Sequence, residues 1–203
     1  MGTGRLRAAM KLLLENWREN LKEDQEYQIY CDMDGVLVDF EQGVVDYITD
    51  KIKTGEAEDL RLAIKREYIT KGDLSGVGKN QDVRKYMYKQ LKDAADFWEN
   101  LPWMSNGPDL WAAIAPYDPN ILTTPMGYGS EIGKQAWIDK NLNPPPQKVF
   151  MSDEKYKWAN KNSILIDDWT KNTIPWEEKG GLALLYKDNE IEKTLAQLQE
   201  LGL

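Results

Sequence analysis

The stretch that decides the fold is Tyr27-Gln28-Ile29-Tyr30-Cys31, followed directly by Asp32-Met33-Asp34-Gly35. Its first five residues are rich in aromatic and β-branched side chains, which is typical of a buried strand. Gly35 then marks a turn. Two carboxylates, Asp32 and Asp34, therefore follow the first predicted strand. Because they lie on a turn rather than on a regular strand, both can face the same site.

Four more strands are expected further along the chain, with helices after the first two and after the last. The strands are predicted at 120–123, 148–151, 163–166 and 182–185, and the helices at 130–141, from about Glu154, and at 188–201. Alternation of this kind predicts an α/β fold with a parallel sheet flanked by helices on both faces. Cys31 is expected to point into the sheet packing as a buried thiol.

Two helical segments lie outside this alternating core. Residues 5–22 predict an amphipathic helix, which packs on the protein's own surface or forms a homodimer contact. From about Gly43 to Ser105 the pattern is helical, with apolar faces at 44–52, 60–68 and 83–91. We therefore expect an N-terminal helix (1–26), a core (27–42 and 106–203) and a small helical cap inserted after the first strand (43–105).

Polar side chains follow four of the predicted strands. They are Asp32 and Asp34, then Thr123 and Thr124, then Asp153 and Lys155, and finally Asp167 and Asp168. In open parallel sheets the ligand lies beyond the carboxyl ends of the strands. Four or more carboxylates in one place repel one another strongly unless a cation lies among them. Mg²⁺ together with a phosphate group fits this set, with Lys155 and the Thr hydroxyls on the phosphate oxygens.

These residue types predict a specific chemistry. Asp32 can attack phosphorus as a carboxylate nucleophile and form an aspartyl-phosphate. Asp34 can protonate the leaving oxygen and later activate the water that hydrolyses the intermediate.

Composition narrows the function classes. The chain has 203 residues, a formal net charge of −8, no histidine and one cysteine. The lack of histidine excludes Ser-His-Asp and Cys-His catalysis and His-ligated zinc, and the single cysteine excludes internal disulfides and thiolate zinc clusters. The acidic balance argues against a nucleic-acid polymer as partner. No apolar run approaches the ~20 residues of a membrane span, so we expect a cytoplasmic protein without a membrane partner.

The four strand-end motifs together resemble the haloacid dehalogenase (HAD) superfamily of phosphohydrolases. Asp32-Met33-Asp34-Gly35-Val36-Leu37-Val38-Asp39-Phe40 resembles its first motif, Ile121-Leu122-Thr123-Thr124-Pro125 its second, Lys155 its third and Ile164-Leu165-Ile166-Asp167-Asp168 its fourth. The resemblance narrows to the 5'(3')-deoxyribonucleotidase branch and its phage and bacterial relatives. It is carried there by Thr123-Thr124-Pro125, by Phe97-Trp98-Glu99-Asn100-Leu101-Pro102 and by Lys134-Gln135-Ala136-Trp137-Ile138-Asp139-Lys140. It covers about residues 27–186.

The resemblance implies a HAD-like Rossmannoid fold and a Mg²⁺-dependent 5'(3')-nucleotidase. It implies Asp32 as nucleophile and Asp34 as acid/base, with Thr123 and Lys155 on the transferring phosphate and Lys155 keeping Asp32 ionised. Mg²⁺ would be held by Asp32, the main-chain carbonyl of Asp34, and Asp168, with Asp167 in support. The implied substrate-binding residues are Phe40, Phe97, Trp98, Thr124 and Lys134, the aromatic ones as platforms for a base.

One position departs from the nucleotidase pattern. Relatives that act on nucleotides often have an arginine two residues before the third-motif lysine, where this chain has Asp153. Either Lys134 replaces that arginine on the phosphate, or the substrate differs. The alternatives are therefore a phosphatase or phosphotransferase that acts on sugar phosphates or polynucleotide ends, and a non-catalytic nucleotide-binding accessory protein.

Plainer interpretations exist for single residues. Asp32 and Asp34 can cap a turn, Thr123 and Thr124 can cap the next helix, and the aromatic residues can be core. Of Lys155 and Lys157, only one is expected to face the site, and Lys155 matches the motif better. Residues 76–80 fail the phosphate-loop pattern and are interpreted as a loop of the cap.

Overall fold

The computed structural model describes residues 27–55, 85 and 88–203. The predicted N-terminal helix with its dimer contact, the helical face at 60–68, part of the face at 83–91 and the loop at 76–80 lie outside the described residues. No helix in the described ranges combines the length and the apolar character that a membrane crossing requires.

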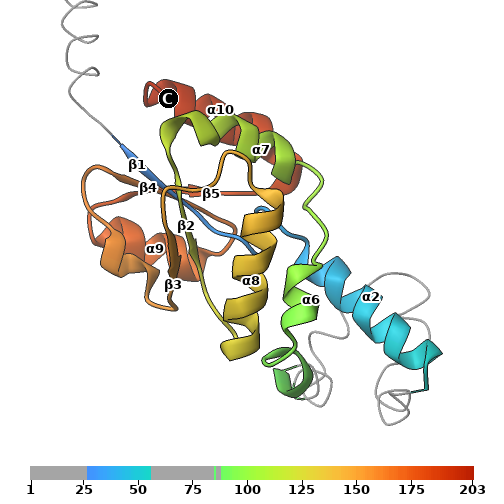
Figure 1. Cartoon of the computed structure of the whole chain (residues 1–203). Coiled ribbons are helices and arrows are strands. Elements are labelled where there is room, and N and C mark those ends of the chain that lie inside the picture. The colour runs from blue at the N-terminus through green and yellow to red at the C-terminus, as the bar shows by residue number, and fades with distance from the viewer. Residues whose placement is uncertain (1–26, 56–84, 86–87) are drawn as a thin grey trace, which may run out of the picture.

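The core is one five-stranded parallel sheet with the strand order β3-β2-β1-β4-β5 (Figure 1). The strands are β1 (Gln28–Cys31), β2 (Asn120–Thr123), β3 (Val149–Met151), β4 (Ser163–Asp167) and β5 (Leu182–Leu185). β1 is central, and its Cys31 pairs with Ile121 on one side and Ile166 on the other. The predicted α/β class is confirmed.

The helices agree with the sequence pattern where that pattern is long. The predicted helix at 130–141 is α8 (Tyr128–Asn141), the short helix is a 3₁₀ turn (Lys155–Trp158), and the closing helix is α10 (Ile191–Glu200) after a 3₁₀ turn (Asp188–Glu190). Two helices were not expected, α7 (Gly107–Ile114) and α9 (Thr170–Glu178). Both are short, and α9 contains Pro175, which hides a helical pattern.

Side-chain alternation along the strands divides the core between the two faces of the sheet. Ile29 and Cys31 of β1 belong to the larger apolar cluster, which α7, α8 and α10 cover. Tyr30 points the other way and packs with Trp176 of α9, their ring centroids 5.3 Å apart. Helices therefore cover both faces of the sheet, as Figure 1 shows.

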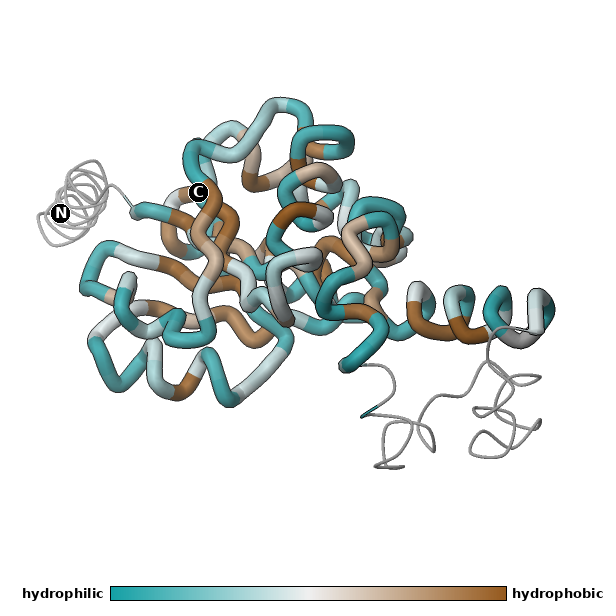
Figure 2. Tube along the Cα trace, turned by 60° about the horizontal axis from the view of Figure 1, so that its bottom comes forward, coloured by the Kyte–Doolittle hydropathy of each residue, from teal (hydrophilic) through white to brown (hydrophobic). Residues whose placement is uncertain are grey.

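The chain leaves the core after β1 and returns before α7. α2 (Phe40–Lys53) extends away from the sheet, with its apolar residues gathered along one side (Figure 2). α6 (Ala95–Glu99) returns along α8. At the crossing, Asp39 donates its N–H to the Pro102 carbonyl at 2.9 Å, and Met104 donates to the Leu37 carbonyl at 2.8 Å. The outgoing and returning segments are thus bound side by side.

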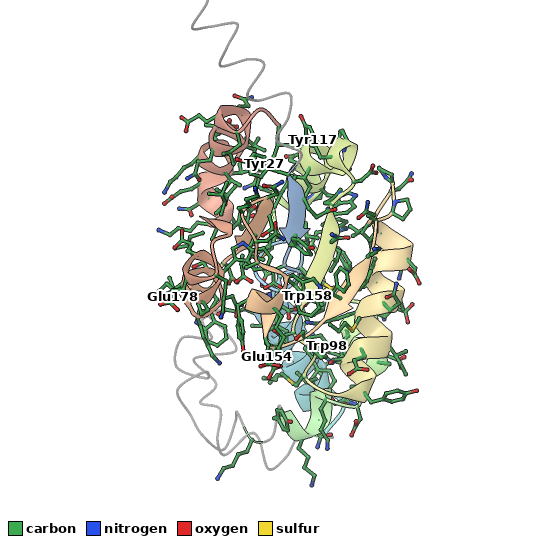
Figure 3. The ribbon with its side chains drawn as sticks, turned by 90° about the vertical axis from the view of Figure 1, so that its left-hand side faces the viewer. Tyr27, Trp98, Tyr117, Glu154, Trp158 and Glu178 are labelled. Atoms are coloured by element: carbon green, nitrogen blue, oxygen red, sulfur yellow. The ribbon has the colours of Figure 1, made fainter. Side chains whose placement is uncertain are left out.

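The ends of the sheet are distinct. Figure 3 shows Tyr27 and Tyr117 at one end and Trp98 and Glu154 at the other. The second end is the carboxyl end, because Tyr27 precedes β1 and Glu154 follows β3.

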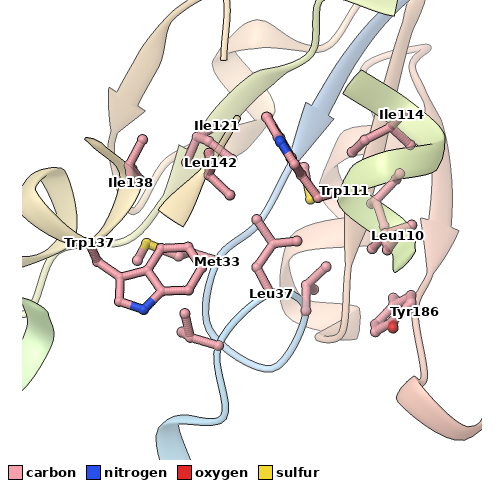
Figure 4. Close-up of a cluster of buried hydrophobic side chains, with 14 of the residues drawn as sticks. Met33, Leu37, Leu110, Trp111, Ile114, Ile121, Trp137, Ile138, Leu142 and Tyr186 are labelled. Atoms are coloured by element: carbon pink, nitrogen blue, oxygen red, sulfur yellow. The ribbon is translucent and has the colours of Figure 1, made fainter. Parts of the chain in front are cut away.

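The turn after β1 is anchored by its apolar residues. Met33 and Leu37 are fully buried in the cluster that contains Trp137 of α8 and Leu110 of α7 (Figure 4). The Met33 carbonyl accepts the N–H groups of Leu37 and Val38, each at 2.9 Å. With Met33 held in the core, the carboxylates before and after it are directed to the carboxyl end of the sheet.

Candidate active site

Lys155 joins two of the strand-end carboxylates. Its Nζ lies 2.7 Å from Oδ1 of Asp32 and 2.7 Å from Oδ2 of Asp167. Burial alone would lower the pKa of this 2% exposed lysine, but the charges of Asp32 and Asp167 outweigh it and raise the pKa. Lys155 is therefore a fixed positive charge beside the predicted nucleophile. Lys157, in contrast, is exposed and pairs with Glu154.

Three carboxylates lie close together at the end of β4. Asp32, Asp167 and Asp168 each offer an oxygen, and these oxygens lie within 4.8 Å of one another. Burial, followed by the charges of Asp32 and Asp167, raises the pKa of Asp168 to about 7. A divalent cation would offset this repulsion, and oxygen-only ligands suit Mg²⁺. The donor set therefore fits the expected magnesium ion.

Glycine at position 35 makes room for this group. Gly35 has φ +75°, and a Cβ on it would lie 2.3 Å from Oδ2 of Asp168. The turn after β1 and the carboxylate after β4 are thus in direct contact, although 133 positions separate them along the chain.

Lys134 of α8 is fully buried and reaches Asp34 and the end of β2. Its Nζ donates to Oδ2 of Asp34 at 2.6 Å, to Oγ1 of Thr123 at 2.8 Å and to the Thr124 carbonyl at 2.8 Å. Burial raises the pKa of Asp34, and the charge of Lys134 opposes that rise. Asp34 Oδ1 is buried and has no hydrogen-bond partner within the described ranges. The protonated form that an acid catalyst needs is therefore favoured by burial.

The hydroxyl of Thr124 is directed elsewhere. Thr124 is exposed, and its Oγ1 donates to the carbonyl of Ser152 at 3.2 Å. Asp153, the position of the departure from the nucleotidase pattern, is also exposed. These residues lie at the rim of the site rather than among its buried groups.

The predicted aromatic residues form one cluster. Phe40 stacks on Trp98 with ring centroids 5.4 Å apart and 19° between the planes, and Phe97 contacts both rings edge-on. Trp98 is 1% exposed, and its Nε1 donates to the Leu91 carbonyl at 2.7 Å. Trp98 is thus a core residue in this conformation, because Phe40 covers its ring, whereas Phe40 and Phe97 are half-buried.

One supporting residue was missed by the sequence analysis. Asn172, in the first turn of α9, donates its Nδ2 to both carboxylate oxygens of Asp167 at 3.0 Å. The Trp169 N–H adds a bond to Asp167 Oδ1 at 2.9 Å. Asp167 is therefore saturated by its own neighbours and by Lys155. Asn172 could have been found only if α9 had been expected, since its site-facing position depends on that helix.

Comparisons with known proteins identify the fold. No protein-family model and no curated protein matches the sequence. Several solved structures share its fold. A HAD-like family hydrolase from Xanthomonas campestris has 15% identity and a TM-score of 0.52, covering 88% of this chain and 93% of that one. A HAD-superfamily hydrolase from Ehrlichia chaffeensis has 15% identity and a TM-score of 0.51, covering 86% and 98%.

A further similar structure has a different named activity. An L-2-haloacid dehalogenase has 12% identity and a TM-score of 0.50, covering 80% of this chain and 85% of that one. A shared fold does not by itself decide the reaction. The chain has the α/β fold of HAD-like hydrolases.

Proposed function

We propose that this protein hydrolyses phosphate monoesters with Mg²⁺ through an aspartyl-phosphate on Asp32, and that its substrates are nucleoside monophosphates. The observation that carries the proposal is the shared position of Lys155. Its ammonium group lies between Asp32 and Asp167, next to the carboxylate of Asp168. A nucleophile, a phosphate-binding cation and a metal-binding carboxylate thus lie in one group, in which Asp32 and Lys155 are buried and Asp168 is exposed.

The first step follows from the position of Asp32. An oxygen of its carboxylate attacks phosphorus, a P–O bond forms, and the bond to the ester oxygen breaks. Asp34 donates its proton to that leaving oxygen, so an alcohol departs and Asp34 becomes a carboxylate. The raised pKa of Asp34 supports its role as the acid.

The second step returns the protein to its starting state. Asp34 accepts a proton from water as the water oxygen attacks phosphorus, and the bond from phosphorus to Asp32 breaks. Inorganic phosphate leaves and both carboxyl groups are restored. Lys155 and the hydroxyl of Thr123 hold the phosphoryl oxygens throughout.

Asp32, Asp168 and the Asp34 carbonyl would hold the magnesium ion, with Asp167 in support. When bound, Mg²⁺ neutralises charge on the phosphoryl oxygens. The charge count supports its presence, because three carboxylates (32, 167 and 168) face one ammonium group, that of Lys155.

The nucleotide assignment is supported by the resemblance to the deoxyribonucleotidase branch and by the cap-side aromatic cluster. Phe40 and Phe97 present half-buried rings on which a base can stack. Asp153 favours a second candidate, a sugar phosphate. An exposed carboxylate at that position repels phosphate, which an arginine would bind, but it can accept hydrogen bonds from sugar hydroxyls.

The test is phosphate release from a panel of ribo- and deoxyribonucleoside monophosphates and sugar phosphates with Mg²⁺, with Asp32→Asn as the control. We expect turnover of nucleotides that Asp32→Asn lacks. Turnover of sugar phosphates alone would keep the mechanism and replace the substrate. No phosphate release from any member of the panel, or halide release from 2-haloacids instead, would overturn the proposal.

A further inference from the structure

Lys134 has all of its donors engaged inside the protein. A lysine ammonium group carries three N–H donors. In this protein three acceptors surround it at 2.6–2.8 Å, namely Asp34 Oδ2, Thr123 Oγ1 and the Thr124 carbonyl. The side chain is 0% exposed, so these contacts are not exchanged with water. Lys134 therefore has no donor left for a phosphate oxygen.

The hydrogen bonds from Lys134 determine which atoms of Thr123 and Asp34 remain available for the reaction. Because the Thr123 oxygen accepts a hydrogen bond from Lys134, the hydroxyl proton of Thr123 remains free to donate to phosphate. Because Lys134 engages Oδ2 of Asp34, Oδ1 is the oxygen that has no hydrogen-bond partner among the described residues. Oδ1 is thus the oxygen left to carry the proton of the acid form.

Packing explains why Lys134 is held in place. The preceding residue, Gly133, lies against α6, where a Cβ would be 2.2 Å from the carbonyl oxygen of Ala95. This close approach brings Trp98 of α6 over Lys134, with Nζ 5.1 Å from the ring centroid. The ammonium group is therefore fixed on one side by an aromatic face and on the other by its three acceptors.

We propose that Lys134 is a positioning residue for the proposed phosphatase reaction, and not a phosphate ligand. It holds the carboxyl of Asp34 and the hydroxyl of Thr123 at a fixed separation, so that the proton donor meets the leaving oxygen while the phosphoryl group is bound. This inference rests on the proposed function. It replaces the expectation that Lys134 substitutes for an arginine on the phosphate.

The test compares two esters that differ in their need for an acid. 4-Nitrophenyl phosphate has a leaving group that departs as a stable anion, whereas an alkyl phosphate has one that must be protonated. We would measure kcat/KM on both esters for wild type, Lys134→Met and Lys140→Met, taking as alkyl ester the one that wild type hydrolyses fastest. Lys140 is the matched control, because it lies exposed on the same helix.

We expect Lys134→Met to lose about 100-fold more activity on the alkyl ester than on 4-nitrophenyl phosphate. Lys140→Met should keep the wild-type ratio. The ratio does not depend on the fraction of folded protein, so partial misfolding does not blur it. If Lys134→Met yields no folded protein, Lys134→Gln, which keeps two donors, takes its place. In an Asp34→Asn background, the Lys134 change should leave the ratio nearly unaltered, because the acid is already absent.

Inhibition by inorganic phosphate distinguishes the two roles. A positioning lysine weakens inhibition only by the contribution of the Thr123 hydroxyl that it orients, because Lys155 still holds the phosphoryl oxygens. Equal losses on both esters, together with much weaker inhibition by phosphate, would overturn the inference and make Lys134 a phosphate ligand. A wild-type protein that hydrolyses neither ester would instead overturn the proposed function itself.

Discussion

The carboxylate of Asp168 occupies the space that a side chain at position 35 would need. A Cβ on Gly35 would lie 2.3 Å from Oδ2 of Asp168, a distance that real Cβ contacts do not reach. The glycine therefore serves two purposes, since it also adopts a φ of +75° in the turn after β1. Through this contact the first and fourth strand ends contribute to one cluster of candidate metal ligands.

Gly35→Ala should destabilise the fold and weaken the metal site. The left-handed backbone alone costs about 1–2 kcal/mol for an alanine, and the contact must in addition push Asp168 aside. We expect a lower free energy of unfolding in urea and a weaker Mg²⁺ affinity by calorimetry. Gly180→Ala separates the two effects, because Gly180 has φ +87° but, its chain neighbours apart, no atom of the described residues lies within 4 Å of its Cβ position. That variant should lose stability and keep its Mg²⁺ affinity; equal Mg²⁺ affinities in the two variants would contradict the role of the contact.

Lys155→Met should be much more harmful than the same change at Lys157. Removing Lys155 leaves the carboxylates of Asp32 and Asp167 buried without their shared cation, which costs about 3–5 kcal/mol when a buried ion pair is broken. Phosphatase activity should fall with it. Lys157 pairs with Glu154 at the surface, so Lys157→Met should keep both stability and activity. Denaturant unfolding and phosphate release measure the two effects. Similar losses in both variants would mean that Lys155 has no special place in the site.

Much of this site could be predicted from the sequence because strand ends are local features. A short apolar run marks β1, β2 and β4, and the polar residues directly after each run must meet at one edge of a parallel sheet. The order of motifs therefore predicted which residues come together before any distance was known.

The rest depends on contacts that no local pattern contains. Lys134 donates hydrogen bonds to residues 34, 123 and 124. All three of its donors have acceptors only because these distant segments meet in the fold. Trp98 was predicted as a platform for a base, but Phe40 stacks on its ring, a contact that the sequence pattern does not contain. α9 was missed since Pro175 interrupts a nine-residue helix, and Asn172 was missed along with it.

Asn172→Leu should weaken the support of Asp167. The substitution keeps the size of the side chain but removes two hydrogen bonds to a buried carboxylate. Hydrogen bonds to charged groups contribute about 1.5–3 kcal/mol, so we expect a loss of stability in that range together with reduced kcat. Asn141→Leu is the control, because among the described residues the Asn141 side chain bonds the carbonyl of Trp137 in its own helix and no group of the site. Wild-type kcat in Asn172→Leu would show that Asp167 needs no outside support.

The pH dependence of the metal-free protein should carry the signature of Asp168. Its pKa is raised from the ordinary value of 3.8 to about 7 by burial and then by the charges of Asp32 and Asp167. A carboxyl whose pKa is higher in the folded state binds more protons there than in the unfolded chain. Its contribution to stability is therefore complete below pH 3.8 and is lost as the pH rises through about 7. Asp34 and Asp167, whose pKa values burial also raises, act in the same direction.

Magnesium should oppose this loss of stability at rising pH, because the ion binds the ionised carboxylates. We expect Mg²⁺ affinity to fall as the pH drops below about 7 and Mg²⁺ binding to release protons, which calorimetry in buffers of different ionisation enthalpy measures. Asp168→Asn removes the titrating group, so its melting temperature in chelator should vary less with pH between 3.8 and about 7. An equal pH dependence in wild type and Asp168→Asn would show that the protons are taken up elsewhere in the protein. Mg²⁺ binding without proton release near neutral pH would mean that the ion avoids Asp168.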